Sequence, residues 1–262
     1  MKFLLAPLMM AACLFVVSDR QGFAGFEPHG YYAPGTPIAG DFVLTGNSGK
    51  WGPSSTYGTT GGVVSYSYMA GGLGMDNSET SVDLGSFMPA GYKAAIAAAF
   101  AAWSAVADIS FVEVADSGHD WNAAGASGDI RIGAHKFDGA GGTLAHGYWP
   151  PPNGTSAAGD IHFDSEETWK IGFGGAGFDV FQVMAHEIGH AIGLSHTGVA
   201  NSLMNPFYTE SFSGLQADDI AGAQFIYGAA TAVPEPSGLA MFGVFAIGVL
   251  GYRRRTTRQM VA

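Results

Sequence analysis

The chain has 262 residues, enough for one substantial domain or at most two small ones. Hydrophobic residues make up 47% and charged residues 13%, which excludes global disorder, and the 40 glycines follow no repeat, which excludes collagen. Residues 25–230 contain five Lys/Arg and twenty Asp/Glu, so nucleic acid is excluded as a partner, because phosphate contacts need cations.

The first 24 residues have the composition of a secretory signal. An early lysine is followed by an apolar run up to Val17, and small residues at 22–24 suit signal peptidase. We predict a signal peptide over 1–24, with an N-terminal strand as the structural alternative. The only cysteine, Cys13, lies in this run, so thiolate metal ligands are excluded from the body of the protein.

After a Gly/Pro-rich lead-in over 25–40, the first regular elements are a strand and a helix. The alternation in "GGVVSYSYMA" predicts a strand over 61–70. The alanine-rich segment 89–108 predicts a helix that begins at Pro89, because its large apolar side chains recur at helical spacing. Those side chains are Ile96, Phe100 and Trp103.

The middle of the chain predicts strands over 109–115 and 128–134. Beyond them the sequence is glycine-rich and has little periodicity. We therefore expect loops to carry the three histidines of this stretch: His135, His146 and His162.

Two further helices are predicted. One runs from Asp179, a natural N-cap, to Gly193, and the other covers 215–228. A helix, several strands and two later helices predict an α+β or mixed fold in one domain over 41–230.

The C-terminal segment 231–262 combines a Pro-Glu-Pro break, an uncharged and mostly apolar run (238–252) and an arginine cluster. Fifteen helical residues span roughly 22 Å, short of a ~30 Å hydrocarbon core. This order resembles the PEP-CTERM sorting tail of Gram-negative bacteria. The resemblance implies export, transient anchoring in the inner membrane by 238–252, and cleavage by an exosortase-type enzyme; a permanent short anchor is the alternative.

The stretch "HEIGHAIGLSH" (186–196) is the strongest functional signal. His186 and His190 are four residues apart on the predicted helix, so their imidazoles share one face, and Gly193 lets the chain turn so that His196 returns to the same ion. Three nitrogen ligands leave a fourth position open, which is typical of catalytic zinc. Glu187 is then placed to act as a general base on an attacking water.

A methionine follows this motif at the distance that a Met-turn requires. Met204, in "SLMNP" (202–206), is expected to pack beneath the zinc site.

With these residues the sequence resembles the matrixin branch of the metzincin zinc endopeptidases. The resemblance runs from about residue 41 to residue 228. Besides the zinc motif it rests on four segments: "DFVLTGNSGKWG" (41–52), "FDGAGGTLAHGYWP" (137–150), "GDIHFDSEETW" (159–169) and "LQADDIAGAQFIYG" (215–228). It implies a twisted mixed β-sheet with three α-helices, an active-site helix followed by a Met-turn, catalytic and structural zinc ions, calcium, and cleavage of peptide bonds within proteins.

The resemblance also implies roles for individual residues. The catalytic zinc ligands are His186, His190 and His196, with Glu187 as base. The structural zinc ligands include His146, His162 and, less securely matched, His135. The calcium ligands are Asp138, Gly139, Gly141, Asp164 and Glu167, with Asp129 and Asp160 at a second calcium position. The substrate-binding residues are Leu144 and Ala145, on an edge segment that pairs with extended substrate, and Pro206 and Tyr208, in the wall of the specificity pocket.

The sequence departs from the family pattern in two places. The usual His-x-Asp pair is shortened to "GAHKFDG" (133–139), so either His135 is a third ligand completed by a water or another carboxylate, or the structural zinc is lost. No cysteine follows Cys13, so we expect no cysteine-switch latency.

The interpretation is thus an exported zinc endopeptidase with protein or peptide substrates, periplasmic, at the cell surface or extracellular in a Gram-negative bacterium. Two alternatives are weaker. A serralysin-type protease normally carries downstream glycine-aspartate calcium repeats, which this sequence lacks. A non-catalytic matrix or adhesion component would not need a base beside three intact ligands.

Overall fold

The computed structural model describes residues 12–16, 42–46 and 49–231. The chain falls into two units, 1–230 and 231–262. The lead-in over 25–40 and the apolar segment 238–252 lie outside the described residues. Among the residues that are described, no helix is long and apolar enough to cross a membrane.

A mixed six-stranded sheet forms the centre of the first unit, with strand order β1-β6-β7-β5-β3-β4. Its strands β3, β4, β5 and β7 are parallel, whereas β6 runs antiparallel to β7 and β1 antiparallel to β6. Their bounds are β1 Ala12–Val16, β3 Gly62–Tyr68, β4 Ile109–Glu113, β5 Ile130–His135, β6 Thr143–Tyr148 and β7 Ile161–Asp164.

Strand β1 lies within the segment predicted as a signal peptide. It pairs with β6 from Ala12 opposite Tyr148 to Val16 opposite Thr143. The strand covers the edge of β6 that was expected to receive substrate. The signal peptide itself stays a prediction.

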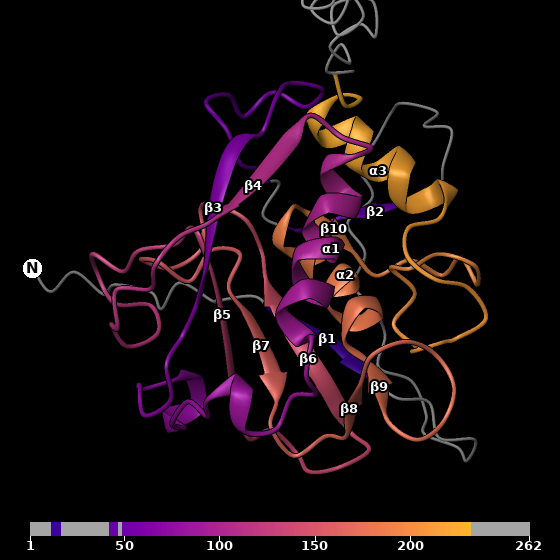
Figure 1. The fold of residues 1–262 in the computed structure, drawn as a ribbon. Helices are drawn as coiled ribbons and strands as arrows, with labels where there is room; N and C mark the ends of the chain where they lie inside the picture. The colour runs from indigo at the N-terminus through magenta and orange to yellow at the C-terminus, as the bar shows by residue number, and fades with distance from the viewer. Residues whose placement is uncertain (1–11, 17–41, 47–48, 232–262) are drawn as a thin grey trace, which may run out of the picture. The chain divides into compact units, whose positions relative to one another are not determined.

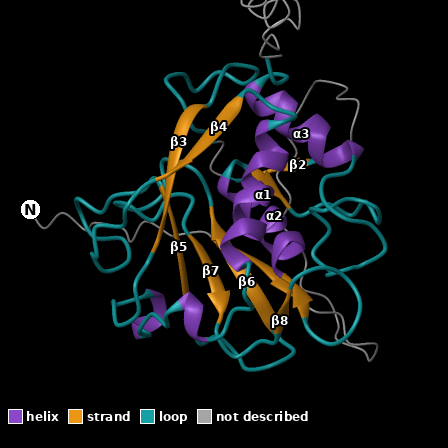
Figure 2. Cartoon of the chain, in the orientation of Figure 1, coloured by secondary structure: helices purple, strands orange, loops and turns teal. Residues whose placement is uncertain are grey.

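Helices α1 and α2 pack against each other and against the sheet, as Figures 1 and 2 show. Helix α1 (Tyr92–Ser104) buries Ile96, Phe100 and Trp103, as their spacing predicted. Its predicted start at Pro89 was wrong: the helix begins at Tyr92, because Gly91 before it has a left-handed backbone with φ +93°.

Helix α2 (Val180–Ala191) begins after Asp179, whose side chain accepts the Gln182 N–H, as predicted. Gly193 has φ +111°, so the chain leaves the helix where glycine is required. Helix α3 (Ala217–Tyr227) completes the set of three.

The expectation that loops carry His135, His146 and His162 was wrong. They lie in β5, β6 and β7, and every residue of these three strands is buried. A strand buried on both faces shows no alternation of polar and apolar residues, so the sequence pattern that identifies an exposed strand is missing here.

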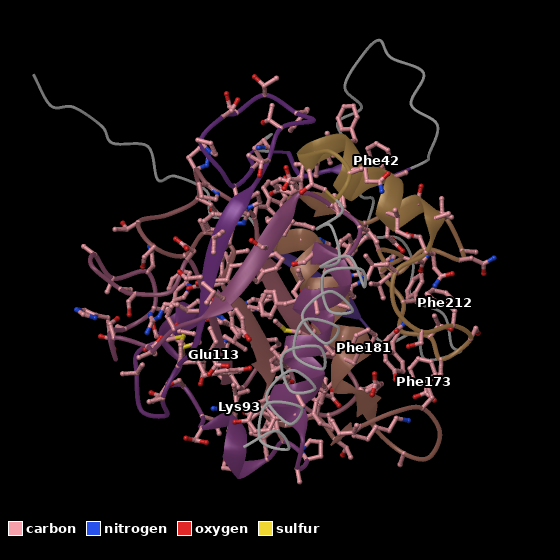
Figure 3. All side chains as sticks on the ribbon, turned by 45° about the horizontal axis from the view of Figure 1, so that its top comes forward. Phe42, Lys93, Glu113, Phe173, Phe181 and Phe212 are labelled. Atoms are coloured by element: carbon pink, nitrogen blue, oxygen red, sulfur yellow. The ribbon has the colours of Figure 1, made fainter. Side chains whose placement is uncertain are left out.

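Two short ladders and two 3-10 turns complete the fold. Strands β2 (Val43–Leu44) and β10 (Leu194–Ser195) pair with each other, as do β8 (Trp169–Lys170) and β9 (Phe178–Asp179). Phe42, just before β2, lies against α3 with its ring centroid 5.5 Å from that of Phe225 (Figure 3). The 3-10 turns η1 (Asp76–Ser78) and η2 (Leu84–Ser86) lie between β3 and α1. The predicted α+β fold with a mixed sheet and three helices is confirmed.

Candidate active site and second metal centre

Helix α2 places the zinc motif at the centre of the molecule. His186, Glu187 and His190 have no exposed surface, and α2 packs against α1 and β6. The indole N–H of Trp103 in α1 donates to the Ala185 carbonyl at 2.9 Å, so it fixes α2 just before the first histidine of the motif.

Three histidine nitrogens converge on one point. The Nε2 atoms of His186, His190 and His196 are 3.1 to 3.2 Å apart. Atoms placed ~2.0–2.1 Å from one ion in a tetrahedral arrangement are separated by roughly 3.3 Å, so the three atoms fit zinc. With three ligands from the protein, a fourth position is left for water or substrate.

The opposite ring nitrogens fix the tautomers that ligation needs. His186 Nδ1 lies 2.6 Å from the Leu203 carbonyl, and His190 Nδ1 lies 2.8 Å from the Leu194 carbonyl. A carbonyl oxygen only accepts, so both Nδ1 atoms carry the proton and both Nε2 atoms present a lone pair. Burial lowers the pKa of all three histidines, that of His196 to about 4, which keeps the imidazoles neutral.

Met204, the residue assigned to a Met-turn, packs against α2 beside Gly189. A Cβ added to Gly189 would lie 2.3 Å from the Met204 sulfur and 3.2 Å from the Trp103 ring. Glycine at 189 therefore leaves room for the Met204 side chain against α2.

Glu187 differs from the neighbouring histidines because its buried carboxylate forms no ion pair with a described residue. Both carboxylate oxygens are buried, and the backbone N–H of Gly147 is the donor that faces the carboxylate. Burial raises the pKa of Glu187, and the backbone N–H of Gly147 in β6 lowers it by a smaller amount. A buried carboxylate of this kind beside three ligand nitrogens fits a general base that acts on an attacking water.

A second group of ligand atoms lies in the sheet. His135, His146 and His162, on three neighbouring strands, surround the carboxylate of Asp76. His135 Nε2 is 2.8 Å and His162 Nδ1 3.4 Å from Asp76 Oδ1, while His146 Nε2 is 3.2 Å from Oδ2. The four ligands form a closed set of the kind that holds structural zinc.

Asp76 is the carboxylate that the structure places beside the third histidine, His135. It lies in η1, between β3 and α1, and is a candidate for the carboxylate expected as a further ligand beside His135. Burial raises the pKa of its carboxyl, but hydrogen bonds from the three histidines outweigh burial and hold the pKa below its usual value. The Tyr148 hydroxyl also donates to Asp76, at 2.5 Å, so the carboxylate is oriented from outside the ligand set.

Comparison with known proteins identifies the family. The matrixin family profile matches residues 80–228, which is more than half of the chain. The chain belongs to the matrixin family. Members of this family are zinc metalloendopeptidases. Asp76 lies before the matched residues.

Curated relatives include karilysin from Tannerella forsythia, 40% identical over 148 residues, which are 55% of this chain and 30% of the relative. Stromelysin-3 from Xenopus laevis is 42% identical over 151 residues, 54% of this chain and 29% of the relative. Interstitial collagenase from Sus scrofa is 35% identical over 207 residues, 78% of this chain and 38% of the relative. The chain thus spans about a third of the length of the curated relatives it matches.

The carboxylates assigned to calcium by the matrixin resemblance lie near one another but do not form a third converging group among the described residues. Asp138 accepts from the Thr143 N–H at 3.0 Å, and Glu167 accepts from the Gly141 N–H at 2.6 Å. Gly139 and Gly141 have φ of +86° and +88°. This loop geometry leaves the calcium assignment a prediction.

Asp164, the third of these carboxylates, has one buried oxygen without a hydrogen-bond partner among the described residues. Burial raises the pKa of both Asp164 and Glu167, and the charge of Asp138 raises both further. Carboxylates that repel one another in this way favour a bound cation.

Asp129 and Asp160, assigned to the second calcium position, have separate partners. Asp129 accepts from the Ser65 N–H and hydroxyl, at 2.8 and 2.6 Å. Asp160 is fully buried and accepts the Arg131 N–H at 2.8 Å. No described contact joins the two carboxylates, so this assignment also stays a prediction.

Two of the predicted substrate-binding residues precede the histidine motif of α2 in the sequence, and two follow it. Leu144 and Ala145 are in β6, which contacts α2. Tyr208 is tied to the start of α2, because its hydroxyl accepts the Asp179 N–H at 2.9 Å and donates to Glu210 at 2.8 Å. Pro206, two residues before it, is half-buried.

Sequence reasoning missed two residues that shape these centres. Asp76 is far in sequence from the histidines that it joins, and no spacing pattern identifies it. Asp219, in the quoted segment 215–228, bonds to the Met-turn; its position three residues after Gln216, at the start of a helix, was the available signal.

Proposed function

We propose that the chain is an exported zinc endopeptidase that hydrolyses peptide bonds within proteins, with Glu187 as the general base. The observation that carries this proposal is the convergence of three histidine Nε2 atoms beside a buried glutamate that forms no ion pair with a described residue. A purely structural zinc site would use its fourth position for a protein ligand.

Different residues have different roles in the proposed reaction. When bound by the three Nε2 atoms, zinc supplies a Lewis acid that polarises the peptide carbonyl and makes water a better nucleophile at neutral pH. Glu187 takes the proton from the attacking water and passes it to the leaving amine. The Leu203 and Leu194 carbonyls hold His186 and His190 in the tautomer that keeps Nε2 free for the metal.

Strand β6 is the proposed binding edge for the substrate backbone. The antiparallel pairing of β1 with all but one of the positions 143–148 supports this role, because it means that the edge accepts an extended segment of chain. Leu144 and Ala145 would pair with the substrate there, and Pro206 and Tyr208 would border its principal side chain.

A second zinc ion is proposed at Asp76, His135, His146 and His162, where it would fasten η1 to the sheet. The convergence of one ligand atom from each of these four residues supports this assignment. Calcium is proposed at Asp138, Gly139, Gly141, Asp164 and Glu167, and at the weaker pair Asp129 and Asp160.

Export is proposed on sequence grounds. Signal peptidase would remove residues 1–24, and an exosortase-type enzyme would process the tail after transient anchoring by 238–252. The mature protein would act in the periplasm, at the cell surface or outside a Gram-negative cell.

Metal analysis of the purified full chain, combined with cleavage of casein and a peptide library, tests the proposal. We expect two zinc ions per chain, cleavage within peptides, and loss of cleavage on chelation that added zinc restores. Zinc bound at the three-histidine centre without any cleavage would contradict the proposed function. Dialysis against a calcium-free buffer that contains zinc should lower the melting temperature, and an identical melting curve with and without calcium would count against the calcium sites.

A further inference from the structure

The carboxylate of Asp219 joins α3 to the Met-turn. Asp219 is completely buried, and its Oδ1 accepts from the Ser202 hydroxyl at 2.5 Å and the Met204 N–H at 3.0 Å. Its Oδ2 accepts from the Leu203 N–H at 2.8 Å and the Gln216 N–H at 2.7 Å. Four donors therefore fix one buried negative charge beneath the catalytic centre.

One of these bonds continues to a catalytic ligand. The Met204 N–H belongs to the same peptide group as the Leu203 carbonyl, and that carbonyl accepts from His186 Nδ1 at 2.6 Å. The imidazole, the peptide group and the carboxylate thus form a continuous chain of hydrogen bonds. In such chains each bond polarises the next, so a charge at one end strengthens the bond at the other.

The Met-turn also contacts the chain beside the third ligand. The Met204 carbonyl accepts the Thr197 N–H at 3.0 Å, and Thr197 follows His196 directly. A shift of the Met-turn would therefore disturb the positions of His186 and His196 together.

We propose that Asp219 is a positioning residue of the catalytic centre, which acts on His186 through the Leu203–Met204 peptide group. Carboxylates that bond directly to a metal-binding histidine fix its tautomer and raise its basicity. In this protein one peptide group, Leu203–Met204, lies between the carboxylate of Asp219 and the ring of His186. The inference rests on the proposed function, since it assigns His186 to a zinc ion.

A purely structural explanation needs only part of this network. Asp219 is in the first turn of α3, where its bond to the Gln216 N–H stabilises the start of the helix. The bonds to Ser202, Leu203 and Met204 contribute nothing to that cap. A cap alone would affect folding, whereas a positioning residue would affect zinc binding by the folded protein.

The chain contains an internal control. His190 Nδ1 donates to the Leu194 carbonyl, which lies outside the Met-turn, so its ring is not linked to Asp219 by the bonds above. Asp218, the neighbouring residue in the same helical turn, offers a matched charge change.

The test compares full-length, zinc-loaded protein with Asp219→Asn and Asp218→Asn. Nitrogen-15 NMR follows the Nδ1–H signals of His186 and His190 while free zinc is buffered over a range of concentrations, so that the affinity of this one centre is measured. We expect Asp219→Asn to weaken zinc binding roughly 10-fold and to speed the exchange of the His186 proton, because a neutral amide retains only one acceptor oxygen. The His190 signal, and both signals in Asp218→Asn, should match the unsubstituted protein.

If Asp219→Asn lowers the melting temperature but leaves zinc affinity and the His186 signal unchanged, Asp219 is a helix cap only and the proposal is overturned. Should that variant not fold, Ser202→Ala replaces it, because it removes the hydroxyl donated to Oδ1; unchanged zinc affinity and His186 signal there would overturn the proposal too. These readouts do not depend on cleavage. A chain that binds zinc with the expected differences but hydrolyses no peptide would contradict the proposed function and leave this inference standing.

Discussion

The two histidine centres of this matrixin use similar ligands but are built in different ways. The catalytic centre takes its three ligands from one helix and the turn after it, within residues 186–196. The second takes its ligands from three strands and a distant turn, between residues 76 and 162. Asp76 fills the fourth position in the second centre, whereas the protein leaves that position open in the first.

The origin of the fourth ligand therefore distinguishes a catalytic metal site from a structural one. A closed set of protein ligands can only hold parts of the chain together, and here it would join η1 to the sheet. An open set with Glu187 beside it can also act on a bound molecule. Substitutions in the first centre should therefore mainly lower activity, whereas substitutions in the second should mainly lower stability.

The largest effect is expected from His190→Ala. Removal of one of three catalytic ligands should lower peptide cleavage by ~10⁴-fold or more, about 5.5 kcal/mol of activation free energy. Cleavage assays and zinc analysis would check this, with one zinc ion retained at the second centre. Cleavage within tenfold of the unsubstituted chain would show that the reaction does not depend on this centre.

Acid should weaken both centres together. Burial lowers the pKa of His162 and of His196 to about 4 from an ordinary value of 6.5. As pH falls from 6.5 to 4, the unfolded chain binds protons at these residues and the folded chain does not, so the free energy of unfolding decreases across this window. Each pKa unit corresponds to ~1.4 kcal/mol, and several kcal/mol are expected in total.

Urea unfolding at pH 7 and pH 5, with and without added zinc, measures this dependence. The control variant His119→Gln replaces an exposed histidine. Its free energy of unfolding should change with pH as that of the unsubstituted chain does. A free energy of unfolding that is equal at both pH values would contradict the burial of neutral histidines.

Asp76→Asn should act on stability rather than on chemistry. Loss of the charge at the centre of three histidines should remove zinc from the second centre and lower the free energy of unfolding by about 3 kcal/mol. Cleavage per folded molecule should stay within about threefold, because the catalytic ligands are not touched. Glu79→Gln, an exposed acid just after η1, is the matched control, and equal urea unfolding of both variants would argue against the second centre.

A smaller effect is expected from Gly189→Ala. The added Cβ would collide with the Met204 sulfur, and the resulting displacement of that buried side chain should cost about 1–3 kcal/mol. In combination with Met204→Ala the penalty should be less than the sum of the two, as a double-mutant cycle would measure. Additive penalties would mean that Gly189 and Met204 do not contact each other.

The contrast between the centres also explains what the sequence could predict. The catalytic ligands are four residues apart on a helix and then follow a glycine turn, so local geometry alone brings them together. The Asp179 cap, the turn at Gly193 and the convergence of His186, His190 and His196 were predictable for that reason.

The second centre depends on how the sheet is assembled. His135, His146 and His162 lie on strands buried on both faces, which carry no alternating pattern, so they were taken for loop residues. Asp76 reaches them only because η1 folds back against the sheet, and no local pattern encodes that contact. Asp219 is a similar case, since its carboxylate acts on a turn that precedes its own helix.

Glu187→Gln tests the central claim most directly. The substitution keeps the shape of the side chain and all three zinc ligands but removes the base. We predict zinc at the same stoichiometry as in the unsubstituted chain and a fall in kcat/KM for peptide cleavage of at least ~10³-fold. Undiminished cleavage of casein or gelatin by the zinc-loaded variant would contradict the account.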